Sequence, residues 1–338
     1  MNRRWSKSIS GLAFSLGLVL LAAFSTNGAQ ASFVVKAAKP NAQIKVAVEY
    51  GALFFPYHSA IKGIIDAHAK KLGIKIISGD SNQKTTTELN NVQNFLVQKP
   101  DCLLLMPVDY TSPAAAEASN GGKVPMVSLD MKAAGPIKSF VGYNQIQGGA
   151  VMGKFVVDTY KKLKKKTIKL MYLRGIPGHP ADVARDKGFK ATLAAAGLDS
   201  TKVKIFEQAT DFDRAKAEAA ATTLLQQNPD MDIVAGMNDD IILGATAAAK
   251  AANIKTGPKG TLHSVGVDGI PEMLKDIADG TVDATAFQNP IPEAKAGLDA
   301  CVAIAKGQTV KEKVLKFTLV TIATAAKSLA AVLPIYKK

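Results

Sequence analysis

Four short apolar runs, each closed by a turn, constrain the fold of this chain more than any other feature. The runs cover residues 103–106, 124–130, 233–240 and 265–269. Continuous apolar runs of this length, rich in β-branched residues, are typical of strands buried on both faces of a parallel sheet. Three of them reach a polar side chain: Asp130, Asn238 and Asp268. Because parallel α/β sheets bind ligands beyond the carboxyl ends of their strands, these side chains are the first candidates for a site.

Segments with helical spacing separate the apolar runs in a regular order. In the first part of the chain, strands are expected at 44–48, 74–77, 102–106 and 124–129, with helices at 58–71, 85–98 and 113–120. After 139–142 the alternation begins again, with strands at 168–173, 203–207, 233–235, 262–267 and 282–287, and helices at 147–163, 181–196, 214–227, 241–252 and 270–278. This alternation predicts parallel sheets with right-handed crossovers. Two such series without a low-complexity linker predict an α/β fold of two lobes, with a cleft that suits a small molecule.

Two local patterns lie at helix starts. Thr85 is followed three residues later by Glu88, which is the spacing of a capping box. Residues 148–154 have the glycine and lysine spacing of a phosphate loop, but Phe155 stands where a magnesium-binding Ser or Thr is needed. We therefore interpret 148–154 as the beginning of a helix.

The first 31 residues have the pattern of a secretory signal peptide. Arg3, Arg4 and Lys7 precede an apolar run over 9–24, and 29–31 is a cleavage site of the small-x-small type. The run is short for a membrane span, and no later stretch is long enough to be one. We therefore expect a soluble protein that is exported to the periplasm.

The chain is basic, and the excess charge has two interpretations. The formal net charge is +14, and removal of the acid-free leader with its three basic residues leaves 14 − 3 = +11. A basic surface can attract an anionic surface or ligand, but it is also an ordinary solvated surface, which we favour. The densest cluster, 161–166, falls where a helix should end, where cations are stabilising. It lacks the interleaved aromatic residues of a single-strand nucleic-acid platform, and no nucleic-acid partner is expected.

The chain has two cysteines, Cys102 and Cys301. Cys102 begins an apolar strand, whereas Cys301 lies in an Ala-rich helix. An exported protein reaches an oxidising compartment, in which a disulfide can form and persist. The sequence is equally compatible with two separately buried thiols, and both alternatives stay open.

Further segments occur in order over residues 44–310. They are Asp-Ser-Asn at 80–82, Glu-Leu-Asn-Asn-Val-Gln at 88–93, Val-Ser-Leu-Asp at 127–130, Arg-Asp-Lys-Gly-Phe at 185–189, Asp-Phe-Asp-Arg at 211–214, Asn-Asp-Asp-Ile-Ile-Leu-Gly at 238–244, Val-Gly-Val-Asp-Gly at 265–269 and Ala-Thr-Ala-Phe-Gln at 284–288. No single segment is specific. As an ordered set, they resemble periplasmic sugar-binding proteins of the ribose-binding type, the type I, class B solute receptors of ABC importers.

The resemblance implies a periplasmic-binding-protein type I fold, in which each lobe is a parallel sheet flanked by helices. Three segments would cross between the lobes, near 142–146, near 288–291 and after 310. The implied division is a signal peptide of 1–31, an N-terminal lobe of 44–143 plus 289–309 and a C-terminal lobe of 144–288 plus 310–338. The helix at 292–306 would return to the N-terminal lobe. The tail at 323–338 has the composition of an extra apolar helix that packs on a lobe.

The resemblance also implies a set of ligand-binding residues. Polar contacts are implied for Asp130, Asn238, Asp268 and Gln288. Such carboxylates and amides can accept and donate hydrogen bonds together at sugar hydroxyls. Phe212, Tyr57 and His58 match positions where rings cover the apolar faces of a sugar. Each polar member also has a purely structural explanation: the two aspartates as turn caps, Asn238 as a helix N-cap and Gln288 as hinge surface.

Three further pocket positions depart from the ribose type: Met106, Met131 and Val183. Asn is common at the first position and Arg is usual at the other two. A buried ligand hydroxyl that faces Met loses its partner, at a cost of about 1–3 kcal/mol, while Met adapts to irregular surfaces. We therefore expect a less hydroxylated or partly apolar ligand, such as a deoxysugar, a short polyol, a furanose-like molecule or a small cyclic alcohol. Three residues are candidates to restore the lost contacts: Glu49, His58 and His179.

The sequence shows no pattern of a catalytic or metal site. It has no nucleophile elbow, and its four histidines, at 58, 68, 179 and 263, lack metal-ligand spacing. We therefore expect no catalytic residue, no metal and no cofactor.

The function that these features favour is that of an exported receptor, not an enzyme. The receptor would capture a small polyhydroxylated or partly apolar ligand between its lobes and deliver it to an ABC importer. The expected partners are the ligand and an ABC permease, with a chemoreceptor as a second candidate, and the protein is expected to be a monomer. The alternative is a secreted enzyme that acts on a small sugar-like substrate in the same cleft.

Overall fold

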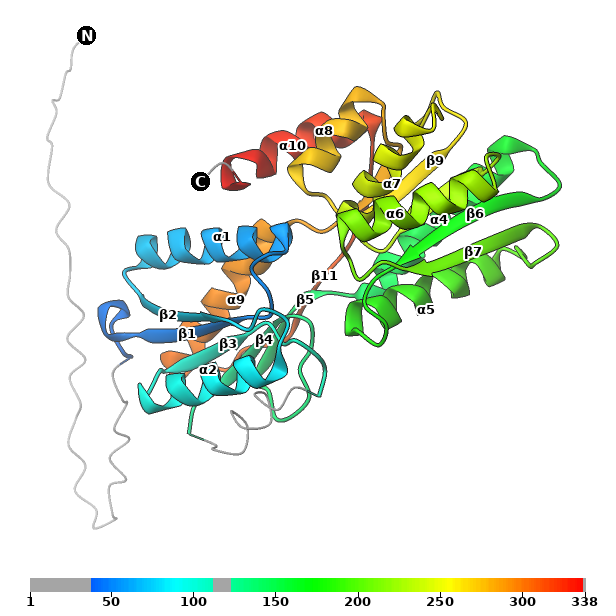
Figure 1. Cartoon of the computed structure of the whole chain (residues 1–338). Helices are drawn as coiled ribbons and strands as arrows, with labels where there is room; N and C mark the ends of the chain where they lie inside the picture. Colours follow the sequence, from blue (N-terminus) through cyan, green and yellow to red (C-terminus); the bar gives the residue numbers. More distant parts are fainter. Residues whose placement is uncertain (1–37, 112–122, 337–338) are drawn as a thin grey trace, which may run out of the picture. The chain divides into compact units, whose positions relative to one another are not determined.

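The computed structural model describes residues 38–111 and 123–336 (Figure 1). The signal peptide expected at 1–31 and the helix expected at 113–120 lie outside these ranges. Within them, no helix is both long and apolar enough to cross a membrane.

The first sheet has six strands in the order β11-β5-β4-β3-β1-β2, and all of its neighbouring pairs are parallel. Its strands are β1 (Lys45–Tyr50), β2 (Lys75–Asp80), β3 (Cys102–Leu105), β4 (Met126–Asp130), β5 (Ser139–Tyr143) and β11 (Lys313–Leu315). A short 3-10 helix, η1 (Asn41–Gln43), precedes β1. The helices of this lobe are α1 (Pro56–Leu72), α2 (Thr85–Val97) and α9 (Pro290–Ala305).

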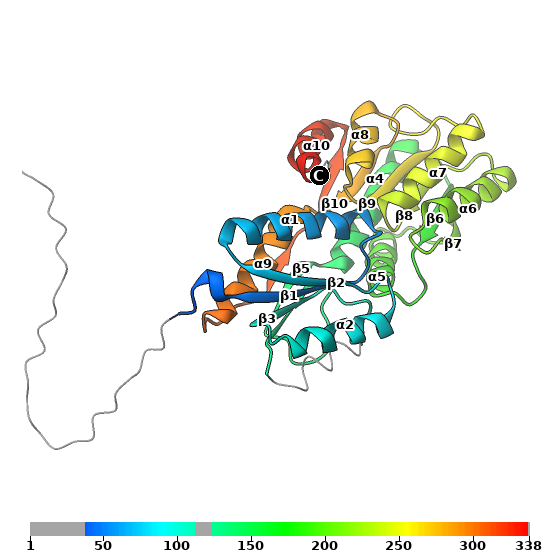
Figure 2. The same cartoon turned by 60° about the vertical axis from the view of Figure 1, so that its left-hand side comes forward.

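Successive residues of the central strands in the first sheet enter different cores. Leu104 packs with α1 and α9 on one face, whereas Leu103 and Leu105 pack with α2 on the other. Figure 2 shows α1 and α2 on opposite sides of these strands. Burial on both faces explains why the strands read as continuous apolar runs.

The second sheet has six strands in the order β12-β10-β9-β8-β6-β7. Its strands are β6 (Ile168–Arg174), β7 (Val203–Ala209), β8 (Ile233–Gly236), β9 (His263–Asp268), β10 (Ala284–Phe287) and β12 (Thr318–Thr321). Its helices are α4 (Gln145–Leu163), α5 (Pro180–Ala195), α6 (Arg214–Gln227), α7 (Asp239–Ala251), α8 (Pro271–Asp279) and α10 (Ile322–Tyr336). The expected α/β fold of two sheets is confirmed, although β12 runs antiparallel to β10 at the edge.

The chain passes from one sheet to the other at three places. Asn144 joins β5 to α4, residues 288–289 join β10 to α9, and residues 316–317 join β11 to β12. The last passage corrects the expected boundary at residue 310, because β11 still pairs with β5 of the first sheet. The tail forms the apolar helix α10, which packs along α8 in the second lobe (Figure 1).

A disulfide between Cys102 and Cys301 fixes α9 to the first lobe. It joins residues 199 positions apart in the sequence, and both residues are fully buried in the same core. Of the two alternatives that the sequence left open, the structure has the disulfide.

Two glycines allow α4 and α5 to pack at unusually close range. A Cβ atom at Gly149 would lie 1.9 Å from the carbonyl oxygen of Arg185, and one at Gly188 would lie 1.9 Å from that of Ile146. Residues 148–154 therefore form a helix–helix contact and not a phosphate loop. The close contact matters for function because it sets the position of Arg185.

Candidate functional site

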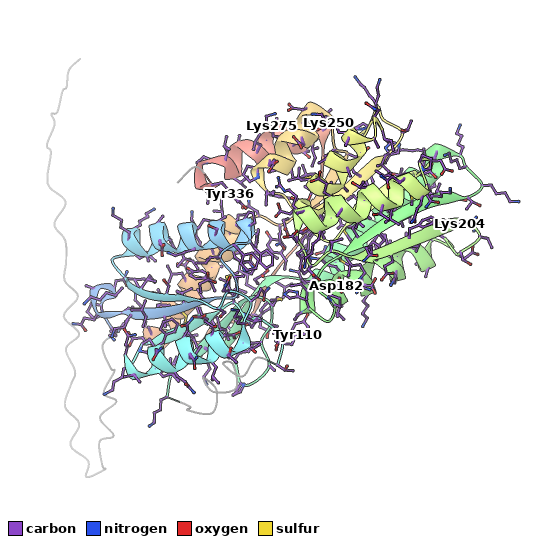
Figure 3. The ribbon with its side chains drawn as sticks, in the orientation of Figure 1. Tyr110, Asp182, Lys204, Lys250, Lys275 and Tyr336 are labelled. Carbon is purple, nitrogen blue, oxygen red and sulfur yellow. A yellow bond between two sulfur atoms is a disulfide. The ribbon has the colours of Figure 1, made fainter. Side chains whose placement is uncertain are left out.

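One pocket is lined by residues from elements of both lobes. Eight of the ten residues expected at the site line it: Tyr57, His58, Asp130, Met131, Phe212, Asn238, Asp268 and Gln288. Figure 3 labels Tyr110 of the first lobe and Asp182 of the second lobe, and neither residue lines the pocket. The hydroxyl of Tyr110 donates to the carbonyl oxygen of Pro180 at the beginning of α5, at 3.5 Å.

Two carboxylates reach the pocket from the carboxyl ends of strands, one in each sheet. Asp130 ends β4 with φ of 65°, and Asp268 ends β9 with φ of 119°. Residues other than glycine rarely adopt such φ values, and backbone strain of this kind is concentrated at functional sites. Within the described residues, neither carboxylate accepts a hydrogen bond from the turn that follows it, so the turn-cap explanation fails for both.

Asp268 lies near two donors, an amide from the passage between β10 and α9 and a guanidinium from α5. Gln288 Nε2 donates to its Oδ1 at 3.1 Å, and Arg185 Nη2 lies 3.6 Å from the same oxygen. Burial raises the pKa of the Asp268 carboxyl to about 7, and the positive charge of Arg185 opposes that rise. Asp239 holds the turn after β9, because its Oδ2 accepts from the backbone N–H groups of Gly269 and Ile270.

Arg185 is the arginine that the second lobe contributes to the pocket. Its Nε donates to Gln145 Oε1 at 2.9 Å, and its Nη1 donates to the carbonyl oxygen of Met237. Val183, the position expected from the sequence, is 50% exposed and does not line the pocket. The two positions are half a helical turn apart on α5, so they face different directions.

Asn238 caps a helix and also lines the pocket. Its Oδ1 accepts from the backbone N–H of Ile241 at 2.9 Å, which makes it the N-cap of α7. Its Nδ2 donates to the carbonyl oxygen of Phe212 at 3.4 Å. The capping bond fixes the side chain at the pocket wall, where the amide reaches the lining.

Aromatic rings from both lobes form one wall of the pocket. The ring centroid of Phe55 lies 6.2 Å from that of Phe212 and 5.5 Å from that of His58, both in edge-on geometry. His179 lies edge-on to Phe212 at 5.3 Å. Burial lowers the pKa of His179 to about 4, with the charge of Arg185 as the next cause, so its ring is neutral near pH 7. The wall supplies apolar area for the face of a ring-shaped ligand.

Tyr57 contributes its ring to the pocket but directs its hydroxyl away from it. The hydroxyl donates to Glu293 Oε2 of α9, and Glu293 is fully buried. Burial raises the pKa of the Glu293 carboxyl well above its usual range, and the nearby charge of Asp130 adds to the rise.

Two other residues that the sequence analysis expected at the pocket, Met106 and Glu49, do not line it. Met106 is fully buried in the core of the first lobe and does not line the pocket. Glu49 is buried beside β2, where its Oε1 accepts from Ser81 Oγ at 2.6 Å and Asn91 Nδ2 at 3.0 Å. It therefore does not restore a ligand contact, whereas His58 and His179 both line the pocket.

The structure adds seven lining residues to those expected: Phe55, Pro56, Gln145, His179, Ala181, Arg185 and Asp240. Two of them carried a signal in the sequence. Arg185 begins the segment 185–189 that resembles the family, and His179 lies in a loop after a strand. Phe55 and Gln145 depend on how a loop and a crossing segment fold, and no periodic pattern marks them.

The described residues include no group of three or more His, Cys, Asp or Glu side chains placed to hold a metal ion. The pocket chemistry is that of hydrogen bonding and ring packing, with three carboxylates, one guanidinium and three amides. This combination suits recognition of a polar, ring-shaped molecule.

Comparisons with known proteins agree with this geometry. Residues 55–309 match the family model of the periplasmic binding protein domain. The ribose import binding protein RbsB of Salmonella typhimurium is 30% identical over 270 residues, covering 79% of this chain and 87% of that protein.

Solved structures show the same architecture. The Caulobacter myo-inositol binding protein matches with a TM-score of 0.77 at 27% identity, over 85% of this chain and 97% of that one. The periplasmic binding protein of the arabinose ABC transporter from Shewanella sp. ANA-3 matches with a TM-score of 0.76 at 26% identity, over 85% and 95%. Proteins of this family are solute receptors, which confirms the expectation of a receptor and not an enzyme. The chain belongs to the periplasmic binding protein family.

Proposed function

We propose that this protein captures a sugar or a related polyol between its two lobes and delivers it to an ABC permease. The observation that carries the proposal is the meeting of Asp130 and Asp268 in one pocket, each from the end of a strand in a different sheet. Carboxylates accept hydrogen bonds from ligand hydroxyls, and the ring wall of Phe55 and Phe212 packs on an apolar face. The similarity to receptors for ribose, myo-inositol and arabinofuranose supports the same ligand class.

The three connecting passages suit a hinge. In such a device the open state dominates without ligand, and a ligand that contacts both lobes favours the closed state. The closed form then presents a surface composed of both lobes to the permease. A chemoreceptor is a second candidate for that surface, and a monomer suffices for the cycle.

The expected signal peptide and the family both favour a periplasmic location. Periplasmic binding proteins are exported, and the expected signal peptide at 1–31 supplies the export signal. The disulfide between Cys102 and Cys301 suits an oxidising compartment. We therefore place the mature protein in the periplasm.

The pocket disfavours ribose itself. Met131 stands beside Asp130, at the position where the ribose type has an arginine, and lines the pocket with an apolar side chain. A ligand hydroxyl at that place would lack a donor. We therefore expect a ligand that differs from ribose in the group it presents to Asp130 and Met131.

A thermal-shift screen of the mature protein against sugars, polyols and cyclic alcohols tests the proposed function. A ligand at about 100 times its dissociation constant adds roughly 2.7 kcal/mol to the free energy of unfolding, which raises the unfolding midpoint by several degrees. The same compound should not shift the Asp268→Ala variant, whereas Glu218→Ala, an exposed change on α6, should respond like the wild type. A screen in which no sugar or polyol shifts the midpoint would reject the ligand class.

A further inference from the structure

Asp130 is a buried carboxylate in the pocket that no Lys or Arg of the described residues neutralises. It is 7% exposed, and its ion-pair partner is His58, whose Nε2 lies 3.4 Å from Oδ2. Within residues 38–111 and 123–336, no Lys or Arg side chain pairs with it. Another ionisable group near Asp130 is Glu293, which is itself a carboxylic acid and cannot neutralise it. A buried carboxylate left in this state is costly unless a charged partner reaches it.

The other acidic groups of the pocket already have partners. Asp268 faces Arg185 at 3.6 Å and Gln288 at 3.1 Å. Asp240 accepts from Arg214 Nη2 at 2.8 Å. Asp130 is therefore the acidic side chain of the described pocket whose ion-pair partner is a histidine, His58, and not a Lys or Arg.

Arg185 cannot also serve Asp130. It is the one Lys or Arg among the lining residues that the structure describes, and its donors face Gln145, Met237 and Asp268. The residue next to Asp130 in the sequence is Met131, which carries no charge. The protein side of the pocket thus has a surplus of negative charge at one defined place.

Hydrogen-bonding capacity points in the same direction. Gln288 is 2% exposed, and its Oε1 has no hydrogen-bond partner within the described residues. If His58 donates from Nε2 to Asp130, its Nδ1 is an acceptor, and that atom is also buried without a partner. Asp130 Oδ1 adds a third free acceptor. A ligand that donates hydrogen bonds would therefore satisfy more of these unpaired acceptors than a ligand that accepts them.

An ammonium group meets both demands, because it carries a positive charge and three donors and has no acceptor. A hydroxyl has one donor and two acceptor lone pairs and brings no charge. The rings of Phe55 and Phe212 in the same pocket also suit a ligand cation, which aromatic faces attract.

We propose that the ligand is an amino sugar or an aminocyclitol, whose protonated amine binds Asp130 beside Met131. This inference rests on the proposed function and narrows it from polyols in general to polyols with one cationic amine. The rest of the ligand uses the polar groups of the second lobe and the ring wall.

Calorimetric titration at pH 7 with matched compounds tests the inference. The compounds are glucosamine with glucose, galactosamine with galactose, and an aminoinositol with myo-inositol. The N-acetylated amino sugars serve as controls, because they keep the nitrogen and lose its charge. At least one amine should bind about tenfold or more tightly than its neutral parent and its N-acetyl form, as a charge-assisted bond predicts.

Two variants locate the effect. Asp130→Asn removes the charge with little change in size, and in this variant the amine should bind no more tightly than its neutral parent. Met131→Arg places a cation beside Asp130 and should likewise remove the preference, which gives an independent test if the first variant folds poorly. Circular dichroism and the unfolding midpoint check the fold of both.

Each outcome has a defined meaning. A neutral parent that binds as tightly as its amine overturns the inference and leaves the proposed function standing. An amine preference that persists in both folded variants overturns the assignment to Asp130. Absence of binding by every compound in both series overturns the inference, while the broader thermal-shift screen decides separately on the proposed function.

Discussion

Asp130 and Asp268 hold left-handed or strained backbone conformations where the pocket needs carboxylates. The φ values of 65° and 119° differ from those of the strands that precede them, so each chain turns sharply at the residue that faces the ligand. Such conformations persist only when the surrounding structure compensates for them. For Asp268, the compensation includes the buried carboxylate of Asp239, which accepts hydrogen bonds from the turn and from Thr285.

A buried carboxyl outside the pocket gives a prediction for pH. Burial raises the pKa of Glu49 from 4.5 to about 7, and hydrogen bonds from Asn91 and Ser81 only partly oppose the rise. The folded protein therefore keeps this proton over a range in which the unfolded chain loses it. The free energy of unfolding should fall as pH rises from about 4.5 to 7, by up to roughly 3 kcal/mol from this group, and level off above pH 7.

Urea unfolding of the wild type and Glu49→Gln between pH 4 and 8 measures this contribution. In the Glu49→Gln variant, the free energy of unfolding should change less between pH 4 and pH 8, because the amide stays neutral at every pH. Glu218→Gln, an exposed carboxylate on α6, is the matched control and should keep the wild-type profile. Identical pH profiles for the wild type and Glu49→Gln would mean that Glu49 is ionised in the folded protein.

At the scale of single residues, the sequence predicts the strand ends better than the helix faces. Asp130, Asn238 and Asp268 follow apolar runs whose ends are visible in the sequence, and all three line the pocket. On α5 an error of two residues moved the expectation from Arg185 to Val183, because a helix turns by more than a right angle with each residue. Met106 follows the end of β3 as expected, but its side chain is fully buried in the core of the first lobe and not in the pocket.

Among the elements, α9 depends most on a connection that the sequence left open. It enters the first lobe from the second, and the disulfide from Cys301 to Cys102 fixes it against β3. Its other attachments include the apolar contacts of Leu298 and Ala294 in the same core and the bond between Glu293 and Tyr57. The disulfide thus links the two separate stretches of sequence that make up the first lobe.

Replacement of both cysteines by alanine should destabilise the first lobe without removing the pocket. Cross-linking of distant residues limits the unfolded chain, and loss of a native disulfide costs roughly 2–5 kcal/mol. Alanine is preferable to serine, because serine would bury two hydroxyls. Equilibrium unfolding of the Cys102→Ala, Cys301→Ala double variant should show a lower midpoint, and the wild type with reductant should move toward it. An unchanged midpoint would show that apolar packing alone fixes α9.

The alternation of strands and helices was predictable, because the elements of the two series, apart from the edge strands β11 and β12, lie close to a periodic or apolar segment of the sequence. The residues that cap the ends of these elements were harder to predict. The capping box expected at Thr85 and Glu88 is wrong, since the N-cap of α2 is Lys84 without a side-chain bond. Glu88 turns inward instead and accepts from the backbone N–H of Val108. A local pattern cannot show that a distant loop needs the same carboxylate.

For the whole molecule, the two sheets and their three connections unite residues that are far apart in the sequence. The pocket takes Asp130 from the first series of strands and Arg185, Asn238 and Asp268 from the second. The sequence predicted the two series, and the resemblance implied the crossings. The exact third passage could not be predicted, because the edge strands β11 and β12 are short and partly exposed and so lack an apolar signature.

The central claim is that both lobes bind one ligand in the pocket between Asp130 and Asp268. Isothermal titration calorimetry with a compound found in the thermal-shift screen tests it, on the wild type, Asp130→Ala, Asp268→Ala and the control Glu218→Ala. We expect one ligand per chain for the wild type and the control. Each aspartate variant should keep its fold and bind roughly a hundredfold more weakly, which corresponds to about 2.8 kcal/mol. Wild-type affinity in either folded aspartate variant would contradict the claim, because the lobe that carries that residue would then not take part in binding.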